Sequence, residues 1–165
     1  MECEHRHEIT WVKQMESTIK AFGHRNWVVI ADSAFPMLSS TGITTLVTDS
    51  DHIDVLRGVL ECINSHSHIR PVIHLDAELQ HVEEQDAPGI ITLRQQLNQL
   101  LNGLDVRREP HMELIRRMND TSNMFQILVL KTNITLPYTT IFIELDCGYW
   151  DETRESQLRQ RMGQL

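Results

Sequence analysis

Two ionisable side chains flank the first apolar run of this 165-residue chain. His24 precedes the run from Trp27 to Ala31, and Asp32 follows it directly. A histidine can give or take a proton near neutral pH, and a carboxylate can orient a hydroxyl group or accept its proton. The run itself is typical of a buried strand. The sequence therefore predicts a strand with a proton-transfer group at each end, although a solvated loop histidine and a strand-terminal Asp would give the same pattern.

A second set of polar residues lies in the C-terminal half. His111 follows Pro110 at the predicted start of a helix, where the partial positive charge of the helix N-terminus disfavours protonation of an imidazole. A neutral His111 could exchange hydrogen bonds with a small polar ligand, or it could be a solvated loop residue. Tyr138 directly precedes an apolar strand, so its hydroxyl and the backbone at Thr139 and Thr140 would lie at the start of that strand. Packing of the tyrosine at a sheet edge is the alternative.

Hydrophobic periodicity predicts the elements that must position these groups. Apolar residues at helical spacing predict helices over 8–22, 51–63, 90–101 and from 110 onward, with a weaker helical segment over 77–86. Predicted strands cover 27–32, 43–48, 71–75, 104–108, 125–130 and 140–145.

Strands alternate with helices, and several of the strands are apolar throughout, which is typical of strands covered on both faces. We therefore predict an α/β fold: a three-layer α/β/α sandwich around a central, mostly parallel sheet of about six strands. The last two strands have no helical pattern between them, so they either pair antiparallel or are joined by an irregular loop. We expect residues 1–165 to form a single domain with a polar C-terminal extension over 147–165 that could include a surface helix.

Composition excludes several classes of function. The formal net charge of −8 argues against nucleic acid as a partner. No apolar run approaches the roughly 20 residues that a membrane span needs, and the N-terminus lacks the apolar core of a signal peptide. The cytoplasm is therefore the expected compartment. The three cysteines are far apart and odd in number, which argues against a disulfide framework.

Other polar groups could bind ions, but their patterns are incomplete. Two sets could bind a transition metal, namely His66, His68 and His74, and Cys3, His5 and His7, yet neither forms a full ligand set at zinc-like spacing. The basic pairs at 107–108 and 116–117 are expected to be solvated ends of elements, with a phosphate site as the alternative. We expect Cys62 and Cys147 to be structural and predict no metal site.

Taken together, these motifs resemble those of the D-ribose pyranase and L-fucose mutarotase family, RbsD/FucU. The shared features, in chain order, are a helix that ends in Gly23-His24, a strand that ends in Asp32 and is followed by Pro36, His111 with the apolar Leu114 three positions on, and Tyr138 before a final strand. Their order and approximate spacing agree over about residues 8–146. The resemblance implies an RbsD-like form of the α/β/α fold.

The resemblance also implies an activity. Such a protein would be an isomerase, a mutarotase or pyranase of carbohydrate metabolism, that interconverts anomeric or ring forms of a free sugar such as ribose or fucose without a cofactor. It would act as a ring-shaped homo-oligomer, described for the family as a decamer, with pockets between neighbouring subunits. Opening a cyclic hemiacetal needs one proton delivered to the ring oxygen and one removed from the anomeric hydroxyl, which suits these residue types.

Residue roles follow from the same resemblance. His24 would donate the proton, and the residues that contact the sugar would be Asp32, His111, Tyr138, Thr139 and Thr140. We predict His24 and Asp32 as the catalytic residues, with Asp32 binding a sugar hydroxyl and helping to fix His24, and with His111 and Tyr138 binding the sugar or assisting proton transfer.

The chain also departs from the family pattern. Thr140 stands where Asn is usual, Ser33 where Ala is usual, and residues 131–133 replace a segment that commonly carries an acidic residue. The tail beyond Cys147 is also longer than in typical members. These differences leave open which sugar is used, and whether the chain catalyses exchange or only binds sugar as a regulatory module. A structural oligomer without a ligand is a third alternative.

Overall fold

The computed structural model describes the backbone of residues 2–163 and the side chains of residues 10–163. The set Cys3, His5 and His7 thus lies outside the described side chains. In chain order the elements are α1 (Glu2–Ala21), β1 (Trp27–Ala31), β2 (Ile43–Val47), α2 (His52–Asn64), β3 (Ile69–Asp76), the 3-10 helix η1 (Ala77–His81), α3 (Ile90–Leu100), β4 (Asp105–Glu109), α4 (His111–Ser122), β5 (Ile127–Lys131), β6 (Ile141–Cys147) and α5 (Glu152–Arg161).

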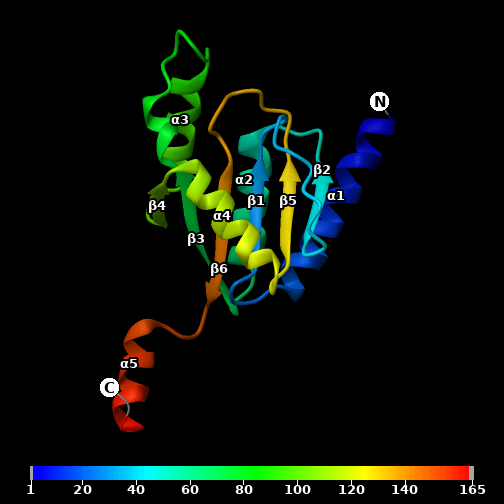
Figure 1. The fold of residues 1–165 in the computed structure, drawn as a ribbon. Helices are drawn as coiled ribbons and strands as arrows, with labels where there is room; N and C mark the ends of the chain where they lie inside the picture. Colours follow the sequence, from blue (N-terminus) through cyan, green and yellow to red (C-terminus); the bar gives the residue numbers. More distant parts are fainter. Residues whose placement is uncertain (1, 164–165) are drawn as a thin grey trace.

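The six strands form one sheet in the order β2-β5-β1-β6-β3-β4 (Figure 1). All neighbouring pairs are parallel except those of β6, which runs antiparallel to both β1 and β3. The mostly parallel six-stranded sheet is therefore confirmed. Strands β5 and β6 lie on opposite sides of β1 and are joined by the irregular segment 132–140. Of the two alternatives for the last two strands, the irregular connection is therefore confirmed, and direct antiparallel pairing between them is wrong.

Helices cover both faces of the sheet, as the apolar strands predict (Figure 1). Buried residues of α1, α2 and α3 pack on one face in a large core that includes Ile19, Leu56 and Leu97. On the other face, Leu114 and Met118 of α4 pack on a smaller core. The α/β/α layering is thus confirmed, and among the described helices α4 is the one that packs on the face where the polar residues of β3, β4 and β6 lie.

The C-terminal helix α5 lies apart from the sheet (Figure 1) and contains no buried residue. The chain reaches it through Gly148, whose N–H donates to the carbonyl of His68 at 3.0 Å. A Cβ at this position would lie 2.3 Å from the carbonyl oxygen of Ser67, so the close passage requires glycine. No helix in the described part of the chain is both long and apolar enough to cross a bilayer.

Candidate functional site

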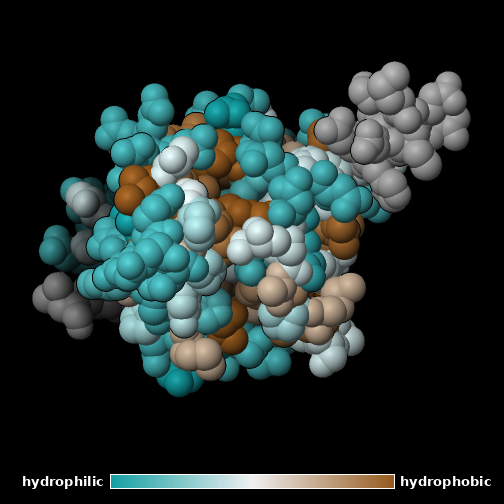
Figure 2. Space-filling model, turned by 90° about the horizontal axis from the view of Figure 1, so that it is seen from above, coloured by the Kyte–Doolittle hydropathy of each residue, from teal (hydrophilic) through white to brown (hydrophobic). Residues whose placement is uncertain are grey.

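One edge of the sheet collects most of the predicted site residues. The carboxyl ends of the parallel strands meet there: Asp32 follows β1, Asp76 ends β3, and His111 opens α4 just after β4. Because β6 runs antiparallel, Tyr138 and Thr140 arrive at the same edge just before it begins. Ligands of open α/β sheets bind at this edge. Viewed from this end, the molecule shows hydrophilic side chains around patches of apolar ones (Figure 2).

His111 is held by a buried carboxylate. Its Nδ1 lies 2.9 Å from both carboxylate oxygens of Asp76, which is fully buried at the end of β3. Because a carboxylate only accepts hydrogen bonds, Nδ1 carries the hydrogen. Nε2 then lies on the far side of the ring, and within the described chain no side chain or backbone group forms a hydrogen bond with it. About a quarter of the His111 side chain is exposed, so Nε2 remains available to a ligand.

The pKa of His111 moves in the opposite direction from the one expected at a helix N-terminus. The hydrogen bond to Asp76 raises the pKa of His111 above its ordinary value against the opposing effect of burial, and the charges of Glu78 and Asp32 raise it further. The pKa of Asp76 is itself raised, chiefly by burial. Three carboxylates around one imidazole therefore outweigh the partial charge of the helix N-terminus, which alone would favour the neutral ring.

The backbone of His111 is fixed as well as its side chain. Both carboxylate oxygens of Glu78 accept its N–H, at 3.1 and 3.0 Å. Pro110 has no N–H to satisfy and no side chain that caps α4, so Glu78 supplies the missing cap from η1. Asp76 and Glu78 are two positions apart in the sequence; the first binds the side chain of His111 and the second binds its backbone N–H.

Tyr138 has a backbone conformation that few residues other than glycine adopt, with φ at +56°. Its ring meets the ring of His111 edge to face, with centroids 5.9 Å apart and an interplanar angle of 83°. Tyr138 is 43% exposed, and so it covers one side of His111 while remaining accessible. Strained backbone of this kind is often found at ligand-binding sites.

A buried histidine that the sequence patterns did not single out fixes the segment around Tyr138. His52 Nε2 donates to the carbonyl of Thr139 at 2.7 Å, and its Nδ1 lies 2.8 Å from the hydroxyl of Thr132. Burial lowers the pKa of His52, which keeps its ring neutral. The signal in the sequence is its place directly after Asp51, the residue that caps α2.

The two threonines after Tyr138 turn their side chains into the protein. Thr139 and Thr140 are buried, and the Thr139 hydroxyl donates to the carbonyl of Leu136 at 2.8 Å. The Thr140 hydroxyl donates to Asp32 at 3.4 Å, a long contact that links the start of β6 to the end of β1. In this arrangement Thr140 orients the carboxylate of Asp32.

His24 lies at the opposite end of β1. Its Nδ1 is 3.1 Å from Asp146, which also pairs with Arg70. Strand β1 alone spans about 17 Å, so within one chain His24 does not meet Asp32, and Asp146 takes the place expected for that aspartate. His24 also lines a cavity of about 520 Å³ beside α4, together with Trp27 and other residues.

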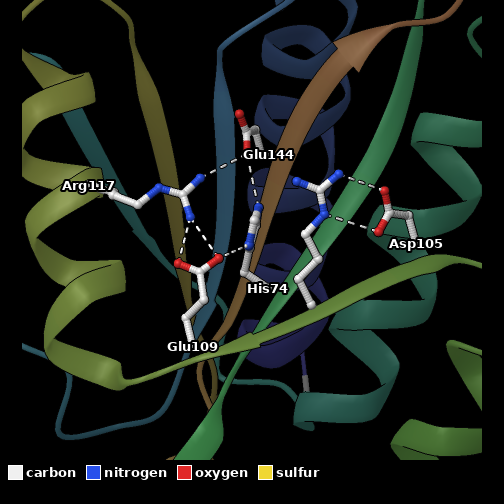
Figure 3. A network of polar contacts seen from close by, with 6 residues as sticks. His74, Asp105, Glu109, Arg117 and Glu144 are labelled. Atoms are coloured by element: carbon white, nitrogen blue, oxygen red, sulfur yellow. Dashed lines mark hydrogen bonds and ion pairs between the residues drawn. The ribbon is translucent and has the colours of Figure 1, made fainter. Parts of the chain in front are cut away.

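A third histidine with carboxylate partners, His74, lies beneath α4 between the two ends of the sheet (Figure 3). His74 is fully buried, with Nδ1 3.0 Å from Glu109 and Nε2 2.9 Å from Glu144. Arg117 contacts both carboxylates, at 2.7 to 2.8 Å for Glu109 and 3.3 Å for Glu144. Carboxylates accept hydrogen bonds, so each nitrogen of the His74 ring faces an acceptor group. Its ring stacks on Trp27 at 5.7 Å.

These contacts separate the histidines that the sequence suggested as a metal set. His74 has both nitrogens on carboxylates, while His66 and His68 bind the carbonyls of Cys62 and Phe22. Among the described residues no group of three or more His, Cys, Asp and Glu side chains has an arrangement that could hold a metal ion.

Comparison with known proteins decides the family. A model of the RbsD / FucU transport protein family matches residues 11–146. The chain belongs to this family. No curated protein sequence matches this RbsD/FucU chain. The family match ends before α5, and so the C-terminal helix lies beyond it.

Solved structures support the same fold at low sequence identity. Bacillus subtilis RbsD complexed with D-ribose superposes with a TM-score of 0.59 at 15% identity, covering 84% of this chain and 93% of that one. Fucose mutarotase from Streptococcus pneumoniae in complex with L-fucose gives 0.52 at 16% identity, covering 78% and 87%. FucU from Bifidobacterium longum gives 0.52 at 13% identity, covering 80% and 92%. The RbsD/FucU chain described here therefore shares their α/β architecture.

Proposed function

We propose that this RbsD/FucU family member is a cytoplasmic enzyme that binds a free monosaccharide and exchanges its anomeric or ring forms by acid–base catalysis without a cofactor. The observation that carries the proposal is the convergence of Asp32, His111 and Tyr138 at the ligand-binding edge of the sheet. Ribose and fucose are the first sugars to test, because related structures contain them.

The chemistry asks for two proton transfers. One group delivers a proton to the ring oxygen as the bond between that oxygen and the anomeric carbon breaks, and another removes the proton of the anomeric hydroxyl as the carbonyl forms. Reclosure on the opposite face of the carbonyl gives the other anomer, and reclosure by a different hydroxyl gives the other ring size. Positioned acid–base groups accelerate such steps by roughly 10²–10⁴. Asp32 and the Tyr138 hydroxyl would hold the sugar beside His111.

The role of His24 in this proposal depends on assembly. Since β1 separates His24 from Asp32 within one chain, we place His24 of one copy against the sheet edge of the next, in a ring-shaped homo-oligomer. A decamer is the size that the family resemblance suggests. Light scattering at micromolar concentration tests this step, and a monomer would remove His24 from the proposed site.

Saturation-transfer NMR of anomer exchange tests the activity directly, with ribose, fucose and other free sugars. We expect at least one sugar to exchange faster with catalytic amounts of protein, and His24→Gln and His111→Gln to reduce that rate. Asp86→Asn, at an exposed position in the loop before α3, serves as a matched control. If no sugar exchanges faster and none binds, the proposed function is wrong.

A non-catalytic sugar-binding protein on the same scaffold is the second candidate. The position of Thr140 favours it, because its short hydroxyl is buried against Asp32 and so leaves less reach toward a sugar than a carboxamide would. Calorimetric binding of a sugar without any acceleration of exchange would select this candidate over the enzyme.

A further inference from the structure

We propose that Asp76 is the positioning residue that makes His111 a proton-transfer group of this site, facing the sugar through Nε2. The inference deepens the proposed function and rests on it. Asp76 lies in no sequence motif that suggested a role, and the family match over residues 11–146 gives no role to single residues. The contacts between Asp76 and His111 carry the inference on their own.

Geometry assigns the tautomer. With both Asp76 oxygens 2.9 Å from Nδ1, the neutral ring keeps its hydrogen on Nδ1 and presents a lone pair on Nε2. When Nε2 accepts a proton, the resulting imidazolium remains paired with the buried carboxylate. The same nitrogen can therefore remove a proton from a sugar hydroxyl and return it to a ring oxygen, without any movement of His111.

Neighbouring groups restrict rotation of the His111 side chain. Glu78 fixes the backbone N–H of His111, Tyr138 meets one side of the ring, and Phe142 lies against it with centroids 6.3 Å apart. The charged groups that face His111 are Asp76 on β3, Glu78 on η1 and Asp32 after β1. All three are acidic, and only Asp76 contacts a ring nitrogen.

The substitution Asp76→Asn removes the charge and keeps the size of the side chain. We expect the ¹⁵N NMR titration of His111 to move to lower pH by about one pH unit, because a neighbouring carboxylate raises a histidine pKa by that order. The limb of the pH–rate profile that reports His111 should move in the same direction and by the same amount. The rate at its optimum should fall by about tenfold or more.

Asp105→Asn is the matched control. It removes one negative charge from β4, where Asp105 is exposed and pairs with Arg107. We expect this variant to leave both the His111 titration and the pH–rate limb in place. If Asp76 had a purely structural role, Asp76→Asn would lower the melting temperature but would leave the His111 titration and the pH–rate limb unchanged.

Two results would overturn the proposal. One is an Asp76→Asn variant that folds with an unchanged His111 titration. The other needs no variant: ¹⁵N shifts of the wild type that place the neutral hydrogen on Nε2. An inactive wild type whose His111 titration still depends on Asp76 would instead overturn the proposed function and leave the pairing intact.

Discussion

Strands β3 and β4 build two histidine–carboxylate contacts within two residues of each other, with the donor and acceptor exchanged. In the first, β3 supplies His74 and β4 supplies Glu109. In the second, β3 supplies Asp76, and His111 follows the end of β4. The sheet register, which places Asp76 opposite Glu109, brings both contacts to the same end of this strand pair.

The two contacts differ in what they leave free. Both nitrogens of His74 are bound, its side chain has no exposed surface, and its ring is stacked on Trp27. His111 has one nitrogen bound and about a quarter of its side chain exposed. The first arrangement binds a buried ring on both sides beneath α4, whereas the second leaves one nitrogen where a ligand can reach it. The number of bound nitrogens thus distinguishes a structural histidine from a candidate catalytic one.

The largest effect should follow from His111→Gln. This variant keeps an amide group that can hydrogen-bond Asp76 but cannot transfer protons, so we expect exchange of the preferred sugar to slow by about 10²-fold or more. NMR exchange rates and urea unfolding of the same sample measure the two consequences. An unchanged rate, or a loss of rate explained by unfolding, would contradict the role given to His111.

His74→Leu should lower the stability of the protein, whereas His111→Gln lowers the exchange rate. The variant removes both ring nitrogens from between Glu109 and Glu144, and we expect the free energy of unfolding to fall by about 2 to 3 kcal/mol. This is less than for fully buried pairs, because the two carboxylates are about 30% exposed. Urea unfolding measures the loss, with the exposed His81→Gln in η1 as control. A change as small as that of the control would show that Arg117 alone stabilises both carboxylates.

The two contacts should also lose their contributions to the free energy of unfolding at opposite ends of the pH range. Burial would raise the pKa of Glu109, but Arg117 and His74 bring it below its ordinary value, and the hydrogen bond from His74 lowers that of Glu144. Their contribution is present above the unfolded carboxyl pKa of about 4.3 and disappears as the pH falls through the folded values. The raised pKa of His111 has the opposite sign: its contribution is present below about pH 6.5 and is lost as the pH rises through the folded value.

Urea unfolding across pH 3 to 9 separates these slopes, each at most about 1.4 kcal/mol per pH unit for one proton. We expect His74→Leu to flatten the acid limb and His111→Gln to flatten the limb above neutral pH. If His74→Leu flattened the limb above neutral pH, or His111→Gln flattened the acid limb, the two contacts would act as one unit.

Local patterns in the sequence were enough to predict the layers but not the partners. Apolar periodicity along single segments predicted the strands and most helices, because each buries a continuous face. The position of β6 between β1 and β3 depends on pairing between strands that are far apart in the sequence, as in the contact of His24 with Asp146. For the same reason Asp76, which directly follows the predicted strand 71–75 and ends the observed β3, gave no sign of its partner His111.

The smallest expected effect concerns Tyr138, the residue that covers the exposed histidine of the two. Tyr138→Phe keeps the ring edge against His111 and the strained backbone at φ +56°, and removes only the hydroxyl. If that hydroxyl binds the sugar, its loss should weaken binding by roughly three- to tenfold, about 1 kcal/mol for one hydrogen bond. Stability and the His111 titration should not change. Calorimetry of the preferred sugar measures the affinity, and unchanged binding would mean that Tyr138 only shields His111.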